Sequence, residues 1–155
     1  MLPIHQFPGF LIRRLHQIST SVFAERMSRE GQDLTPVQYA ALTAIGSNPG
    51  LDQATLAGMI AYDRVTIGGV VDRLVSKGLV ERETSARDRR ARVLHLSAAG
   101  TSLLTRLDGI ARAAQDDILS GLDPAEQAQF IKLMIKVTDA GNSRSRAPLQ
   151  LKDTA

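Results

Sequence analysis

The feature that most restricts the fold is a change in apolar periodicity between Gly78 and Ser97. On either side of this segment, apolar residues recur every three or four positions, which is typical of amphipathic helices. Within it the period becomes an alternating one, and residues 79–82 and 92–96 are expected to form strands, with a polar turn at residues 83–91. The sequence therefore predicts a mainly α-helical protein with one small β-hairpin.

Capping residues mark where several helices should begin. A Ser, Thr or Asp side chain can accept a hydrogen bond from a free backbone N–H of the first helical turn, and Pro fits the first helical position. A capping box adds Gln or Glu three residues later. We expect helices to start after Thr35, Asp52, Asp63, Ser97 and Asp123, with capping boxes at Thr35 and Asp123.

Length and composition indicate one domain. A chain of 155 residues, 43% of them hydrophobic, can bury a core without disulfides. We assign the short helices and the hairpin to a lobe at about residues 34–97, within a domain that spans residues 1–140. Residues 1–33 and 98–140 supply long helices, and residues 141–155, rich in polar residues, are expected to be a disordered tail.

Positive charge is concentrated in the turn of the hairpin. Residues 82–92 contain five Arg against two acidic residues, so this stretch alone matches the formal net charge of +3. Arg suits planar, bidentate contact with phosphate. A solvated charged loop would show the same composition, and the context of the turn has to decide between the two interpretations.

That context is a pair of short helices directly before the basic hairpin, the arrangement of a winged helix-turn-helix. The second helix can enter the major groove of DNA while the hairpin reaches the neighbouring minor groove. The apolar face of this second helix should pack inward, and the opposite face offers Arg64, Thr66, Gly68, Gly69 and Arg73 to DNA. The two glycines fit either close approach to DNA or close packing against another helix. Asp72 is expected to orient Arg73 or Arg64.

Several motifs resemble those of the MarR family of transcriptional regulators. They are Lys77-Gly78-Leu79-Val80-Glu81-Arg82, then Asp88-Arg89-Arg90, then Leu94-His95-Leu96-Ser97-Ala98-Ala99-Gly100. The resemblance covers about residues 10–140. It implies that Asp88 braces the wing, that Arg90 enters the minor groove beside Arg89, and that the N- and C-terminal helices form a homodimer on an inverted-repeat operator in double-stranded DNA.

The resemblance also implies a small aromatic acid as effector. Residues 62–74 are similar to those of MarR-type repressors of nicotinate degradation, which respond to 6-hydroxynicotinate. We therefore expect a repressor that a small aromatic carboxylate releases from DNA. A cation and flat apolar walls would be needed, and the candidates are His5, Phe10, Arg13, Arg14, Tyr39, Tyr62 and Asp63, each of which could equally serve ordinary packing.

Other classes of protein fit the sequence less well. The chain has no Cys, which excludes disulfides and thiol chemistry, and its three His are scattered, so neither a metal site nor a catalytic constellation is expected. No cofactor, membrane span or secretion signal is expected either, and a cytoplasmic location follows as an expectation. A helical protein-interaction module without DNA binding remains the alternative.

Overall fold

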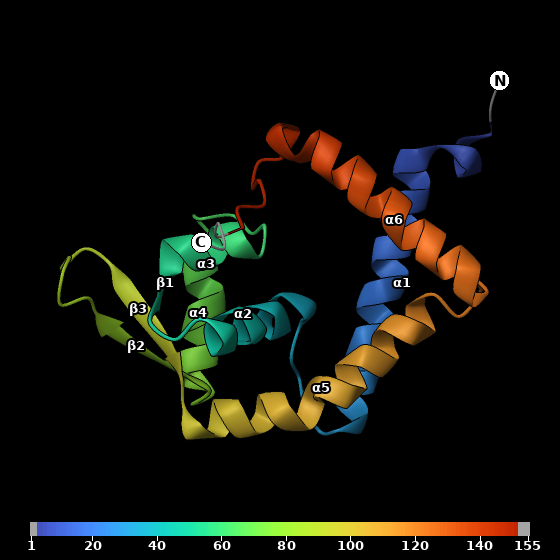
Figure 1. Cartoon of the computed structure of the whole chain (residues 1–155). Helices are drawn as coiled ribbons and strands as arrows, with labels where there is room; N and C mark the ends of the chain where they lie inside the picture. The colour runs from blue at the N-terminus through green and yellow to red at the C-terminus, as the bar shows by residue number, and fades with distance from the viewer. Residues whose placement is uncertain (1–2, 152–155) are drawn as a thin grey trace.

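The computed structural model describes residues 3–151 and is mainly helical. The helices are η1 (Ile4–Gln6), α1 (Pro8–Arg29), α2 (Pro36–Ser47), α3 (Gln53–Met59), α4 (Ile67–Ser76), α5 (Ala98–Ile118), α6 (Pro124–Gly141) and η2 (Asn142–Arg144). The strands are β1 (Leu51–Asp52), β2 (Val80–Thr84) and β3 (Arg92–Leu96). In Figure 1, α2, α3, α4 and the strands gather in one lobe, which α5 joins to α1 and α6 on the other side of the molecule. No helix in this part of the chain is long and apolar enough to cross a membrane.

Four of the predicted helix starts are confirmed by their hydrogen bonds. The capping boxes at Thr35 and Asp123 are both complete, with each side chain bonded to the backbone of the residue three positions on. Asp52 caps α3 by accepting from the backbone N–H of Thr55, and Ser97 caps α5 in the same way.

The fifth predicted start, Asp63, lies one turn before the helix it was expected to cap. One carboxylate oxygen of Asp63 accepts from the N–H of Val65 at 2.8 Å, and its carbonyl oxygen accepts from the N–H of Ile67 at 2.9 Å. Asp63 thus organises the turn that leads into α4. Thr66 occupies the N-cap position, but its hydroxyl donates to the carbonyl oxygen of Asp63 at 3.3 Å and does not cap the helix.

The hairpin is part of a three-stranded antiparallel sheet with the order β1-β3-β2. Strand β3 has the predicted bounds, and its register with β2 runs from Val80 opposite Leu96 to Thr84 opposite Arg92. Strand β1 adds two residues, with Leu51 opposite Leu94. Strand β1 was not predicted, because a two-residue strand has no periodicity of its own and its partner strand is far along the chain.

The hydrophobic core lies where α2, α4 and the sheet meet the helices α1 and α5. The largest side chains that are almost fully buried are Met27, Leu42, Ile45, Leu56, Ile67, Leu74, Leu94, Leu107 and Val71. The long helices α1 and α5 pack side by side. The Arg26 guanidinium of α1 donates to the Asp117 carboxylate of α5 at 2.6 Å.

The start of α5 is packed tightly against the chain that enters β2. The N–H of Ser97 donates to the carbonyl oxygen of Leu79 at 3.1 Å, and the Ser97 hydroxyl donates to the carbonyl oxygen of Gly78 at 2.6 Å. A Cβ at Gly100 would lie 2.0 Å from the same Leu79 oxygen. Only glycine therefore fits position 100, which explains the Gly that ends the third motif.

The segment after α6 differs from the expected disordered tail. Gly141 is the last residue of α6, residues 142–144 form η2, and the backbone N–H of Gln150 donates to the carbonyl oxygen of Gly58 at 2.8 Å. Composition missed this arrangement because its hydrogen bonds join residues far apart in sequence. Residues 152–155 of the expected tail lie outside the described residues.

Candidate nucleic-acid interface

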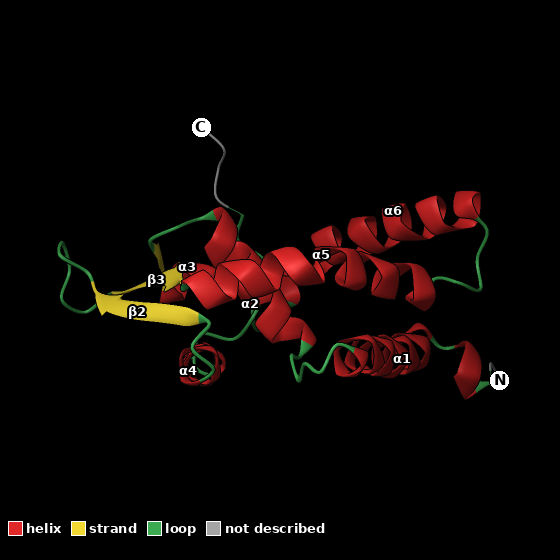
Figure 2. Cartoon of the chain, turned by 90° about the horizontal axis from the view of Figure 1, so that it is seen from below, coloured by secondary structure: helices red, strands yellow, loops and turns green. Residues whose placement is uncertain are grey.

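Helix α4 has one buried face and one open face. Ile67, Val70, Val71 and Leu74 are buried, as the predicted apolar face requires. Arg64, Thr66, Gly69 and Arg73 are exposed, and Gly68 is half-buried. Seen from below in Figure 2, α4 lies at the edge of the lobe, beside the strands of the wing. The residues predicted to meet the major groove are thus gathered on and just before one helix.

The two glycines of α4 have different surroundings. A Cβ at Gly69 would meet nothing within 4 Å, so this position faces open space. A Cβ at Gly68 would lie 3.5 Å from the side-chain nitrogen of Gln53 in α3, an ordinary contact. Close packing between helices therefore accounts for neither glycine. Of the two interpretations, close approach to DNA is the one that the open surface at Gly69 fits.

Asp72 has a different partner from the one expected. Its carboxylate accepts from the Arg82 guanidinium at 2.6 Å, so it joins α4 to β2 and does not orient Arg64 or Arg73. The pair depends on how β2 folds back against α4 after the turn at Gly78, so no local pattern in the sequence predicts it. At the far end of α4, the Lys77 ammonium binds the Asp33 carboxylate, and this hydrogen bond lowers the pKa of Asp33. One ion pair thus links the middle of α4 to β2, and another links the residue that follows α4 to Asp33.

The tip of the wing is held by side chains that bind its own backbone. Asp88 accepts from the N–H of Arg90 at 2.9 Å, and the Ser85 hydroxyl accepts from the N–H groups of Arg87 at 3.2 Å and Asp88 at 3.3 Å. Arg89 and Arg90 are exposed. The turn therefore has a defined conformation that presents its guanidinium groups outward, unlike a loosely solvated charged loop.

Three residues of this surface, Val65, Arg82 and Ser85, were not predicted from the sequence. Val65, beside Thr66 at the start of α4, has 90% of its surface exposed, and an apolar side chain so exposed next to polar neighbours was a signal that could have been used. Ser85 precedes Asp88 by three residues, a spacing typical of turns built on side-chain oxygens. Arg82 belongs to both the Arg cluster and the first motif, but neither pattern predicts its pairing with Asp72.

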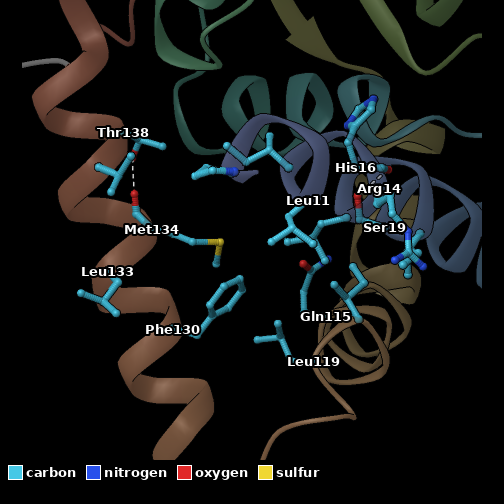
Figure 3. Close-up of a pocket in the computed structure, with 16 residues that line it drawn as sticks. Leu11, Arg14, His16, Ser19, Gln115, Leu119, Phe130, Leu133, Met134 and Thr138 are labelled. Carbon is cyan, nitrogen blue, oxygen red and sulfur yellow. Dashed lines mark hydrogen bonds between the residues drawn. The ribbon is translucent and has the colours of Figure 1, made fainter. Parts of the chain in front are cut away.

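A large apolar groove lies in the other part of the molecule. It has a volume of about 870 Å³ and is lined by α1, the end of α5 and α6, among others by Leu11, Leu15, Ile118, Phe130 and Met134 (Figure 3). No residue of α6 is buried, and Leu133 and Val137 on this helix have 50% and 67% of their surface exposed. Helix α6 thus presents an apolar face that its own chain does not cover.

The candidate effector residues fall into separate places. His5, Phe10 and Arg13 form one cluster, in which the His5 ring meets the Phe10 ring edge-on with 6.1 Å between centroids and the Arg13 guanidinium lies 5.1 Å above Phe10. Arg14 lines the apolar groove. Tyr39 packs on Phe23, with 5.8 Å between ring centroids, and burial raises its pKa.

Tyr62 and Asp63 belong to the connection between α3 and α4, across the molecule from η1 (Figure 1). Within residues 3–151, no hydrogen bond, ion pair or aromatic contact joins the His5 cluster, Arg14, Tyr39 and the α3–α4 connection to one another. The same part of the chain brings together no group of three or more His, Asp or Glu side chains that could hold a metal ion.

Comparison with known proteins identifies the family. Residues 32–91, which contain the helix-turn-helix and most of the wing, match the model of the MarR family. A putative transcriptional regulatory protein for the hcr operon of Thauera aromatica is 35% identical over 81% of this chain and 75% of its own length.

Two solved structures have the same architecture. The PcaV transcriptional regulator of Streptomyces coelicolor, in complex with its natural ligand, is 34% identical over 91% of this chain and 98% of its own, with a TM-score of 0.82. A mutant MarR from E. coli complexed with operator DNA is 25% identical over 83% of this chain and 91% of its own, with a TM-score of 0.75. Architecture, motifs and sequence similarity agree, and the chain belongs to the MarR family of transcriptional regulators.

Proposed function

We propose that this protein is a sequence-specific DNA-binding repressor that inserts α4 into the major groove and the wing into the adjacent minor groove. The observation that carries the proposal is the outward face of α4 together with the braced, basic wing tip. The solved complex of E. coli MarR with operator DNA supports the same use of this fold. Free energy of binding would come from phosphate contacts, and specificity from base edges.

We propose a role for each candidate residue of α4 and the wing. Thr66 and Arg73 read base edges in the major groove, because hydroxyl and guanidinium groups can bond to them directly. Arg64 and Arg89 bind phosphates, and Arg90 inserts into the minor groove. The absence of a side chain at Gly69 and the small size of Gly68 let the helix backbone approach the bases. Asp88 acts through the wing that it holds.

We further propose a homodimer in which a second copy covers the apolar groove between α1 and α6. Exposed apolar side chains on both helices, such as Ile12 and Val137, support this assignment, because single soluble chains rarely leave so large an apolar surface in water. A two-fold dimer presents two α4 helices, so the operator should be an inverted repeat with half-sites about 10 base pairs apart.

The proposed effector is a small aromatic carboxylate, with 6-hydroxynicotinate as the first candidate. Its carboxylate would pair with Arg13 or Arg14 and its ring would lie against Phe10, with His5, Tyr39, Tyr62 and Asp63 as further candidate contacts. Arg13 is the stronger candidate cation, since Arg14 lines the groove assigned to the second copy. The solved PcaV structure contains a natural ligand, which supports effector binding in a relative of this similarity.

Salt-dependent binding to duplex DNA tests the central proposal. We expect the full chain to select inverted-repeat duplexes from a random library, with affinity that falls steeply as salt rises. A chain that binds duplex DNA only weakly and without sequence preference would instead favour the protein-interaction alternative.

Calorimetry with 6-hydroxynicotinate, salicylate and benzoate tests the effector separately, comparing Arg13→Ala with Arg14→Ala. If none of the three acids binds below millimolar concentration, the effector proposal fails and the DNA proposal stands.

A further inference from the structure

The chain after α6 forms a strap, which we define as residues 142–151. Two hydrogen bonds close its loop: the N–H of Leu149 donates to the Asn142 side-chain oxygen at 2.8 Å, and the Asn142 side-chain nitrogen donates to the carbonyl oxygen of Leu149 at 3.0 Å. In Figure 1 this segment runs from the red end of α6 across to α3. The strap therefore has a defined conformation, and it leads from the end of α6 to α3.

The strap is docked on the helix-turn-helix lobe at two points. The N–H of Gln150 donates to the carbonyl oxygen of Gly58 in α3 at 2.8 Å, and the Arg146 guanidinium binds the Asp63 carboxylate at 2.9 Å. A Cβ at Gly58 would lie only 2.8 Å from the Gln150 side-chain oxygen and 3.1 Å from the Gln150 Cβ. The absence of a side chain at position 58 is thus matched to the strap.

The second docking point is Asp63, in the turn that leads into α4. One Asp63 oxygen binds the N–H of Val65 while the other binds Arg146, so the strap holds the turn from which the DNA-facing side chains project. At its other end the strap continues directly from α6, a helix with no buried residue. The strap is therefore a direct physical connection between the uncovered helix α6 and the start of α4.

We propose that the strap couples the position of α6 to that of α4 and so restricts the separation of the two α4 helices in the dimer. This inference rests on the proposed DNA-binding function. An isolated ion pair with an Arg side chain that is 86% exposed contributes little, so the coupling depends on the ion pair and the backbone hydrogen bond together. Releasing the strap should widen the range of half-site spacings that the dimer accepts and weaken binding to the preferred spacing by about fivefold, the lower end of typical couplings between sites.

Docking of the strap can be measured without DNA. In the full chain the amide hydrogens of Leu149 and Gln150 should exchange much more slowly than those of an unstructured peptide, because both donate hydrogen bonds. Gly58→Ala should abolish the protection of Gln150. In a chain that ends at Gly141, the same substitution should raise the melting temperature, since Ala favours a helix and no strap obstructs it. Unprotected amides in the full chain would overturn the proposal.

Coupling is measured with inverted-repeat duplexes selected on the full chain, whose half-site spacing is then changed by one base pair in each direction. The chain that ends at Gly141, which lacks both docking points, should lose about fivefold in affinity at the preferred spacing. Arg146→Ala, which lacks only the ion pair, should lose less than the shortened chain but more than Arg144→Ala. The shortened chain and Arg146→Ala should also discriminate less between spacings. Arg144→Ala is the matched control, because it removes the same charge from the strap and Arg144 has no ion pair among the described residues.

The two possible failures are distinguishable. If Arg146→Ala and Arg144→Ala have the same affinities and the shortened chain keeps the spacing preference of the full chain, the coupling is overturned and the DNA-binding function stands. If the full chain selects no duplex at all, the proposed function fails and the coupling fails with it.

Discussion

At the scale of single residues, Arg90 gives the most direct test of DNA recognition. Its backbone N–H is held by Asp88 at 2.9 Å and the residue is exposed at the wing tip. Arg90→Ala should weaken operator binding by about 1–3 kcal/mol, because it removes the guanidinium and leaves the backbone hydrogen bond in place. Fluorescence titration of a labelled operator measures the effect, with Arg106→Ala on α5 as the control for loss of one charge. Equal losses in the two variants would contradict minor-groove insertion.

Asp88 should favour DNA binding even though its negative charge repels the phosphates. Removing a negative charge near DNA favours binding, whereas losing the carboxylate that holds the Arg90 N–H loosens the wing and disfavours it. We expect Asp88→Ala to weaken operator binding, and its effect to add less than fully to that of Arg90→Ala. Glu83→Ala on β2 reports the effect of charge alone. Stronger binding by Asp88→Ala would show that the carboxylate does not brace the wing.

At the scale of elements, the cap of α3 gives a pH-dependent stability. Burial raises the pKa of Asp52, but hydrogen bonds from the Thr55 hydroxyl and from backbone N–H groups outweigh it, so the pKa is lowered overall. A carboxyl with a lowered pKa in the folded state stabilises the protein above its unfolded pKa of about 4 and loses that contribution as the pH falls through the folded value.

Asp52→Ala should therefore lower the free energy of unfolding by about 1 kcal/mol at pH 7 and by much less at pH 3. Urea unfolding at one fixed protein concentration measures this difference. Asp52→Asn keeps a capping oxygen that does not titrate, so it should show a smaller loss at pH 7. A pH-independent effect of Asp52→Ala would argue against the ionised cap.

The start of α5 gives the second prediction at this scale. A Cβ at Gly100 would lie 2.0 Å from the carbonyl oxygen of Leu79, so Gly100→Ala forces two backbone segments apart. We expect a loss of about 1–3 kcal/mol or more in the free energy of unfolding. Gly109→Ala is the matched control in the same helix, because a Cβ there meets nothing within 4 Å and should stabilise the helix by up to about 1 kcal/mol. Equal melting temperatures for the two variants would contradict the packing described.

At the scale of the whole molecule, the apolar groove between α1 and α6 predicts that a charged side chain placed in it will prevent dimer formation. Leu133 lines the groove and has 50% of its surface exposed in the single chain. Leu133→Glu should convert the dimer to monomers, because a carboxylate buried between two copies would lose its hydration. Sedimentation velocity at micromolar concentration measures the change, with Lys132→Glu as the neighbouring control outside the groove lining. A dimer unaffected by Leu133→Glu would place the interface elsewhere.

The sequence predicted what local hydrogen bonds and periodicity decide. The caps at Thr35 and Asp123 were predictable because each depends on residues three positions apart, and β3 because its apolar pattern alternates. Contacts between distant segments were not predictable. The Asp72–Arg82 pair and the docking of Gln150 on Gly58 depend on how the helices cross, which no local pattern specifies. For the same reason the candidate effector residues did not come together as one site within the chain.

The open face at Gly69 has an evolutionary consequence. A side chain added there meets nothing within 4 Å, and replacing Gly by Ala in a helix adds about 1 kcal/mol of stability, so substitution at this position is compatible with the fold. Selection on the operator sequence can therefore act at position 69 without opposition from selection on folding. After a gene duplication, this is a position at which two copies of the regulator could first diverge in the promoters that they recognise.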